Sequence, residues 1–144
     1  MRQPYVSDLL PVLQQGLQDE MNSAFQYIAL AGKHGDVAIK QAFLRYASEE
    51  LQHAQKLLGM LEQQQVEVGE IPLTLENLDD LYLYLIEYMA HEESAIFYYE
   101  ALEQLVQQPE VARLCQEVRG EEQLHLRQMR ELYQQVKEGT RHDG

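Results

Sequence analysis

Apolar side chains recur at intervals of three and four residues along most of the chain, which is the period of helices with one buried face. Proline and glycine, which interrupt helices, fall mostly between these stretches. The pattern predicts four helices and no strand. Their predicted limits are Ser7 as N-cap to residues 31–35, Asp36 as N-cap to about Gln64, Asn77 to about Gln107, and Pro109 to near Gly139.

The lengths of the connections predict how these helices are arranged. The first and last connections are short, so the first two helices and the last two helices should each form an antiparallel hairpin. The middle segment "VEVGEIPLTLEN" at 66–77 carries the strongest non-helical signals. About 12 extended residues span about 40 Å. The sequence therefore predicts an all-α four-helix bundle with a long crossover between its second and third helices.

The two halves of the chain repeat one another without a gap. "EELQH" at 49–53 returns as "EEQLH" at 121–125, and "EMNSAFQYIAL" at 20–30 aligns with "EESAIFYYEAL" at 92–102. The repeat units are 1–72 and 73–144. We expect one domain over 1–144, in which two hairpins are related by a pseudo-twofold axis.

Charged residues interrupt the apolar stripes at matching places in both halves. Each half reads Glu, six residues, Tyr, twenty-two residues and then Glu-x-x-His. Glu20 lies fifteen residues before Gly35 and Glu50 fifteen after it, so a hairpin turning there brings the two carboxylates to one height. Residues three apart share a helix face, so His53 points the same way as Glu50. The residues predicted to converge in the core are Glu20, Glu50, His53, Glu92, Glu122 and His125.

Four buried carboxylates would each cost several kcal/mol without compensating charge. Two divalent cations would balance them, and two neutral imidazoles would complete the ligand set without adding charge. Mixed oxygen and nitrogen ligands favour iron or manganese over magnesium or calcium. The pattern predicts a site for two Fe or Mn ions, or a mixed Fe/Mn pair, which Zn could also occupy as a non-native ion.

Composition narrows the range of partners. The 144 residues include 24 acidic and 11 basic side chains, and the net charge of −13 disfavours nucleic acid and anionic membranes. No apolar run approaches the ~20 residues of a membrane span. The single Cys115 allows no internal disulfide, and the first residues do not have the pattern of a signal peptide, so we expect a cytoplasmic protein.

These motifs resemble the ferritin-like di-iron carboxylate superfamily, specifically its rubrerythrin and bacterioferritin branch, over nearly the whole chain. The resemblance implies that Glu50 and Glu122 bridge two irons. It implies that Glu20 and Glu92 are terminal carboxylates, and that His53 and His125 each bind one iron.

Tyr27 and Tyr99 occupy matching positions in the repeat and have two interpretations. By the resemblance, they are catalytic tyrosines whose hydroxyls bond to the ligand carboxylates. From the residues alone, they could also be plain core aromatics two turns from a glutamate, since buried Tyr is common.

The sequence also departs from its relatives at three points. Ala95 stands where rubrerythrins carry an extra carboxylate, and one cysteine cannot build their four-cysteine rubredoxin module. Leu51 stands where bacterioferritins carry a haem-binding Met, so haem is not expected. Electrons for repeated turnover would then come from an external electron-donor protein.

Several functions are compatible with this site. The leading hypothesis is a protein that binds two Fe(II) ions and oxidises them with O2 or hydrogen peroxide, as a ferroxidase or in iron handling. The alternatives are a rubrerythrin-like peroxide reductase with an external donor, a dimanganese catalase, a non-catalytic iron-binding or storage subunit, and a metal-free bundle used for association.

The third helix is apolar on both sides. Its outer side, opposite Glu92, carries Leu83, Ile86, Ala90, Phe97, Ala101 and Leu105. A helix that is apolar all round is normally buried all round. We therefore expect a symmetric homo-oligomer, most simply a homodimer formed through this helix.

Overall fold

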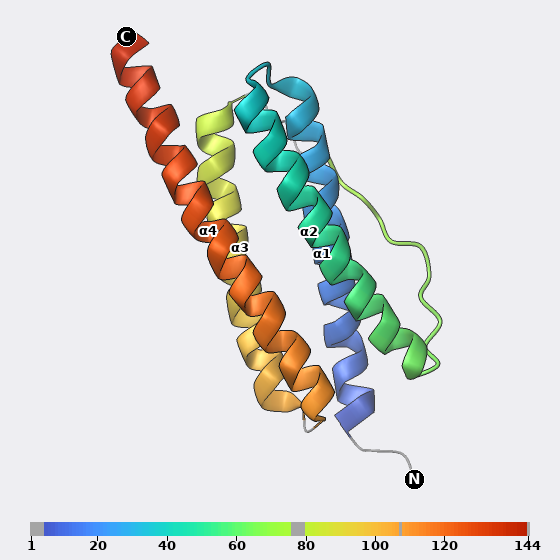
Figure 1. Cartoon of the computed structure of the whole chain (residues 1–144). Helices are drawn as coiled ribbons and strands as arrows, with labels where there is room; N and C mark the ends of the chain where they lie inside the picture. The colour runs from blue at the N-terminus through green and yellow to red at the C-terminus, as the bar shows by residue number, and fades with distance from the viewer. Residues whose placement is uncertain (1–4, 76–79, 107, 144) are drawn as a thin grey trace. The chain divides into compact units, whose positions relative to one another are not determined.

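The computed structural model describes residues 5–75, 80–106 and 108–143, with side chains over 10–75, 80–106 and 108–139. The described residues form four helices and no strand (Figure 1). The helices are α1 (Tyr5–Lys33), α2 (Val37–Gln63), α3 (Leu81–Leu105) and α4 (Pro109–Asp143). The predicted all-α class is confirmed. None of the described helices is long and apolar enough to cross a membrane.

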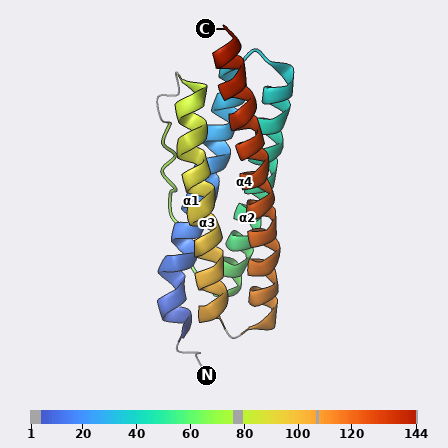
Figure 2. The same cartoon turned by 90° about the vertical axis from the view of Figure 1, so that its left-hand side faces the viewer.

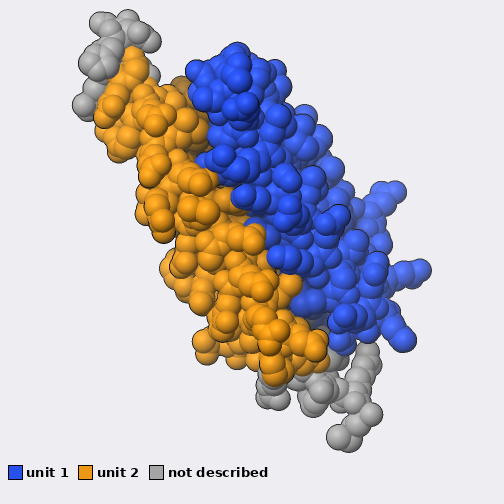
Figure 3. Space-filling model, viewed as in Figure 1, with its two compact units in different colours: residues 1–77 blue, residues 78–144 orange. Residues whose placement is uncertain are grey.

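The chain divides into two compact units, residues 1–77 and 78–144 (Figure 3). Unit 1 is the hairpin of α1 and α2, and unit 2 is the hairpin of α3 and α4. The unit boundary falls after the crossover rather than at the repeat boundary of 72 and 73, because the crossover packs on α1. A single domain over 1–144 stays a prediction.

Side-chain caps fix where two of the helices begin. Asp36 caps α2 as predicted, with its Oδ1 accepting a hydrogen bond from the Ile39 amide at 3.1 Å. Asp80 caps α3 in the same way, with its Oδ1 accepting from the Tyr82 amide at 2.9 Å. Such caps satisfy amides that have no partner inside the helix. The predicted start of α3 at Asn77 lies outside the described residues.

Two helix ends differ from the prediction. α1 begins at Tyr5, before the predicted cap Ser7, and takes Pro11 into the helix. α4 begins at Pro109 as predicted but continues through Gly139 to Asp143. The predicted end at Gly139 is wrong because this glycine does not adopt the left-handed conformation that ends helices. A glycine inside a helix costs only about 1 kcal/mol. α3 ends at Leu105, and Gln107 lies outside the described residues.

The crossover between α2 and α3 is attached to α1 by two amide side chains. Asn22 Nδ2 donates to the Pro72 carbonyl at 3.0 Å, and Asn22 Oδ1 accepts from the Thr74 amide at 2.8 Å. Gln26 Nε2 donates to the Thr74 carbonyl. These side chains pair with backbone groups of an extended segment that follows α1 along its length (Figures 1 and 2).

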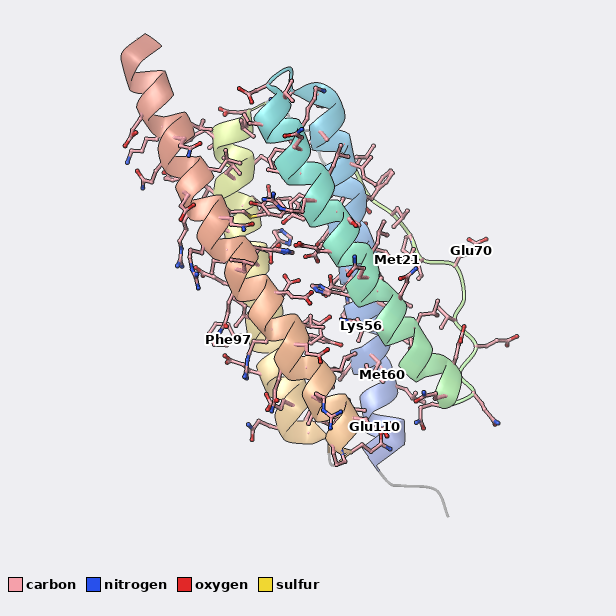
Figure 4. All side chains as sticks on the ribbon, in the orientation of Figure 1. Met21, Lys56, Met60, Glu70, Phe97 and Glu110 are labelled. Carbon is pink, nitrogen blue, oxygen red and sulfur yellow. The ribbon has the colours of Figure 1, made fainter. Side chains whose placement is uncertain are left out.

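The outer face of α3 is exposed in the single chain. Leu83 is 61% exposed and Phe97 70% exposed, and Figure 4 shows Phe97 projecting away from its helix. The face predicted from the sequence therefore exists, and it is opposite the buried Glu92. An apolar surface of this kind is typical of an interaction site.

α2 ends in a Schellman motif whose left-handed residue is not glycine. Gln65 has a φ of 59°. The Val66 amide bonds to the Leu61 carbonyl at 3.1 Å, and the Gln65 amide bonds to the Glu62 carbonyl at 2.9 Å. These bonds satisfy carbonyls at the helix end. The left-handed conformation costs energy for any residue with a Cβ atom.

We expect Gln65→Gly to raise the free energy of unfolding by about 0.5–1 kcal/mol, because glycine adopts a positive φ without steric cost. The matched control is Gln41→Gly, an exposed position inside α2, which should lower it by about 1 kcal/mol. Urea unfolding followed by circular dichroism measures both changes. Destabilisation by both substitutions would contradict the assignment of the cap.

Candidate metal centre

Unit 1 brings Glu20 of α1 together with Glu50 and His53 of α2. The turn between the helices is centred near Gly35, and the Asp36 cap sets where α2 begins, so the two glutamates reach the same height. All three side chains are buried, at 4%, 2% and 0% exposure. His53 Nδ1 lies 3.4 Å from Glu20 Oε2 and 4.0 Å from Glu50 Oε1. One ligand atom of each residue lies within 4.8 Å of those of the other two.

Unit 2 forms the same arrangement from the second half of the repeat. Glu92 comes from α3, and Glu122 and His125 come from α4. Their exposures are 3%, 1% and 0%. His125 Nδ1 lies 3.9 Å from Glu92 Oε2, and one ligand atom of each residue lies within 4.8 Å of the others.

Each of these Glu-Glu-His triads has the chemistry and spacing of a divalent metal site. Two ligand atoms about 2.1 Å from one ion lie about 3.0 Å apart at octahedral angles and about 3.4 Å apart at tetrahedral angles. The His53 to Glu20 separation of 3.4 Å falls at the upper end of this range. Two carboxylates and a neutral imidazole carry a charge of −2, which one divalent cation neutralises. In both triads the ring nitrogen nearest the carboxylate is Nδ1.

The structure thus brings each predicted half-site together within its own hairpin. All six residues are buried, as their places on the apolar stripes predict. Their role as metal ligands, and the union of the two triads in one centre, stay predictions.

Both predicted catalytic tyrosines are buried. Tyr27 is 0% exposed and packs against Phe43 and Tyr46, with ring centroids 6.0 and 5.6 Å away. Tyr99 is 1% exposed, and its ring lies 4.9 Å from that of Tyr98. These surroundings fit a core aromatic, and the hydrogen bonds from the hydroxyls to ligand carboxylates stay predictions.

An aromatic stack on α3, which ends at His91 next to Glu92 in the sequence, was not predicted from the sequence. The ring of Tyr88 lies 4.1 Å from that of Tyr84 and 5.1 Å from that of His91, with interplanar angles of 24° and 21°. The spacing of four and three residues along a helix could have indicated it. We call these three residues the α3 column.

Gln26 is a buried polar residue whose role was not predicted from the sequence. It is 3% exposed, and its amide bonds to the crossover. Its place on a helix gives no sign of this partner, because the crossover is distant in sequence.

Cys115 lies on α4 and is fully buried. Burial, which has the largest effect, and the nearby Glu103 carboxylate together raise the pKa of its thiol to about 11, against the opposing effect of the Arg119 guanidinium. Arg119 itself is paired with Glu103 at 2.9 Å. The thiol therefore stays protonated near neutral pH, in accord with a packing role.

We expect Cys115 to resist iodoacetamide at pH 9 in the folded protein and to react readily in urea, as mass spectrometry would show.

The raised pKa of Cys115 also predicts that the free energy of unfolding depends on pH. The thiol favours the folded state below pH 9, and this contribution is lost as the pH rises toward about 11. The difference in free energy of unfolding between the wild type and Cys115→Ala should shrink between pH 9 and about pH 11. A difference that stays constant over this interval would contradict the raised pKa of the thiol.

A family model described as Rubrerythrin matches residues 12–133 of the chain. A crystal structure of a ferritin-like, diiron-carboxylate protein from Bacillus anthracis str. Ames is similar at a TM-score of 0.80. That match has 20% sequence identity and covers 92% of this chain and 99% of the other. No curated protein matches the sequence. The structural likeness shows the fold, which is a ferritin-like four-helix bundle as predicted.

Proposed function

The chain belongs to the rubrerythrin family, and from this membership we propose that it is a non-haem di-iron carboxylate protein that binds two Fe(II) ions and oxidises them with O2 or hydrogen peroxide. The observation that carries the proposal is the pair of buried Glu-Glu-His triads, one in each hairpin. The similar structure from Bacillus anthracis is described as a diiron-carboxylate protein, which supports the same use of this fold.

We propose that the two triads join in one dinuclear centre. By the family resemblance, Glu50 and Glu122 would be shared by the two ions, and Glu20 and Glu92 would be terminal ligands. His53 and His125 each bind one ion through Nδ1, which is the ring nitrogen that lies toward the carboxylates. Two divalent ions balance the four carboxylates, so the buried centre is neutral.

The protein contributes position, dehydration and charge to this chemistry. Iron, when bound, supplies the electrons that reduce the oxidant. The carboxylates hold their places because each is buried and is carried by a helix rather than a loop. The charge of −13 raises the concentration of cations around the chain, which favours uptake of Fe(II).

Ferroxidase or iron-handling activity is favoured over peroxide reduction by two features. Ala95 supplies no additional carboxylate one turn after Glu92, and the chain has one cysteine, so it holds no four-cysteine iron site as an electron source. Repeated reduction of peroxide would need electrons from an external donor protein. We place the protein in the cytoplasm, with no nucleic-acid or membrane partner.

The double variant Glu50→Ala/Glu122→Ala should lose the ability to bind metal, because both proposed bridges are removed. The matched control is Glu49→Ala/Glu121→Ala, which makes the same change of charge one residue earlier on each helix. Elemental analysis after anaerobic Fe(II) loading should give about two ions per chain in the wild type and control, as the ligand count requires. At free metal about 100 times Kd, both should gain about 2.7 kcal/mol of stability for each ion bound, and the double variant none.

In the metal-free state the same double variant should be more stable than the wild type, by about 1–3 kcal/mol, because buried charge has been removed.

Oxidant added to the Fe(II)-loaded wild type should produce the near-ultraviolet band of an oxo-bridged diferric pair. Full metal content in the double variant would contradict the ligand assignment. Two manganese ions in the purified protein would replace the iron proposal with a catalase-like one, and loading without turnover would indicate storage.

We also propose a homodimer, or a larger homo-oligomer, formed through the outer face of α3. Phe97→Asp and Leu83→Asp should each shift the protein to monomer, because a charge placed in an apolar interface is dehydrated. Leu44→Asp is the control, since Leu44 is 51% exposed on α2 and outside the proposed face. Sedimentation velocity distinguishes the species. A wild type that is monomeric at micromolar concentration would contradict this proposal.

A further inference from the structure

Helix α3 carries five of the nine tyrosines of the chain, and two of them belong to the α3 column. Tyr84 and Tyr88 are 2% and 3% exposed, and the rings are stacked at 4.1 Å. The side chain of His91, stacked on Tyr88, is 52% exposed. The column therefore connects buried phenols to the surface through rings in contact.

The buried part of the column lies beside the metal triad of unit 2. Tyr88 precedes Glu92 by four residues, so the two side chains share one face of α3, and both are buried. Tyr84 precedes Tyr88 by the same interval. One turn of helix thus separates an oxidisable phenol from a proposed iron ligand.

The corresponding positions of unit 1 have no such column. The repeat places Val12, Gly16 and Asp19 on α1 where α3 has Tyr84, Tyr88 and His91. The aromatic cluster of unit 1 is Tyr27, Phe43 and Tyr46, and each of these side chains is at most 1% exposed.

Charge also distinguishes the two groups of aromatic rings. The guanidinium of Arg45 lies 5.5 Å from the centroid of the Tyr46 ring. A cation over a ring stabilises its electrons and opposes their removal. The unit 1 cluster is therefore closed to solvent and harder to oxidise, whereas the α3 column is open at His91.

We propose that the α3 column is a built-in electron donor to the Glu92, Glu122 and His125 site, a role that rests on the proposed iron chemistry. It acts when a single ferrous ion meets hydrogen peroxide. Peroxide needs two electrons to form two waters, and such an ion gives only one. Tyr88 supplies the second electron, so the peroxide is fully reduced and no hydroxyl radical is released.

The step balances in atoms and electrons. The O–O bond of hydrogen peroxide breaks and two waters form. The first electron comes from Fe(II), which becomes Fe(III). Tyr88 gives the second electron and its hydroxyl proton and becomes a neutral phenoxyl radical, and solvent gives the other proton. The stacked ring of Tyr84 can share the loss of the electron. A small enediol reductant such as ascorbate restores the phenol by giving one electron at the exposed His91 end, and solvent returns the proton to the phenoxyl oxygen.

The test is electron paramagnetic resonance of protein loaded anaerobically with one Fe(II) per chain, mixed with one equivalent of peroxide and frozen rapidly. We expect an organic radical whose spectrum narrows when the protein contains ring-deuterated tyrosine. The variant Tyr84→Phe/Tyr88→Phe should lose this signal. Tyr46→Phe is the matched control and should keep it. Equal signals in the wild type and the double variant, or loss of the signal in Tyr46→Phe, would overturn the proposal.

A second arm needs no metal and therefore separates this inference from the proposed function. The metal-free protein is oxidised by a photogenerated ruthenium(III) polypyridyl complex, and the yield of tyrosyl radical is followed by its absorption. Because Tyr82, Tyr98 and Tyr133 are more exposed than the two tyrosines of the column, all three proteins also carry Tyr5→Phe, Tyr82→Phe, Tyr98→Phe and Tyr133→Phe. In that background the double variant should lose most of the yield, and Tyr46→Phe should lose little. Equal yields of tyrosyl radical in all three proteins would overturn the proposed role of the α3 column as an electron donor. A failure of the protein to bind iron would overturn only the proposed function. Circular dichroism confirms that each variant is folded.

Discussion

The free-energy cost of burying carboxylates governs the construction of this protein. The four glutamates of the triads are each less than 5% exposed. Dehydrating a carboxylate is unfavourable by several kcal/mol unless opposite charge or hydrogen bonds compensate for it. Imidazole supplies ligand atoms but, when neutral, no charge. Each hairpin, which buries two of these carboxylates beside an imidazole, therefore holds them where a cation would compensate their charge.

The heights of the carboxylates depend on local features of the hairpin. In unit 1, the Asp36 cap determines the first turn of α2 and therefore the level at which Glu50 meets Glu20. A shift by one residue would rotate Glu50 by about 100° around its helix and out of the core. The crossover adds a constraint to the same helix, since Asn22 bonds to it only two residues from Glu20. The positions of the triad side chains are thus determined by caps and connections that lie outside the triads.

Much of this arrangement could be predicted because it follows from helical periodicity and the internal repeat. The six ligand candidates lie on apolar stripes, and a stripe predicts burial whatever surrounds it. The end of α4 could not be predicted, because Gly139 has the residue type of a helix stop without the conformation. The bonds of Gln26 depend on where the crossover lies, and the α3 column depends on the rotamers of Tyr84 and Tyr88. Periodicity places Tyr84, Tyr88 and His91 at neighbouring positions on the helix, but it contains no information about the rotamers that stack the rings or about the path of the crossover.

The two halves are alike in their ligands and different in their surroundings, and the physics of each explains why. A Glu-Glu-His set can change little, because altering one member leaves buried charge or an incomplete coordination shell. The apolar core around the triad can be packed by different combinations of hydrophobic side chains with similar stability. Phe43 and Tyr46 of unit 1 therefore correspond to Cys115 and Val118 of unit 2, and all four are buried. In unit 2 the small side chains of Cys115 and Val118 lie on α4, and the large rings of Tyr84 and Tyr88 lie on α3. The aromatic residues of unit 2 are therefore on its first helix, whereas Phe43 and Tyr46 of unit 1 are on its second. A repeated hairpin can in this way keep the same Glu-Glu-His triad in both copies, while the aromatic residues around the two triads differ in their exposure to solvent.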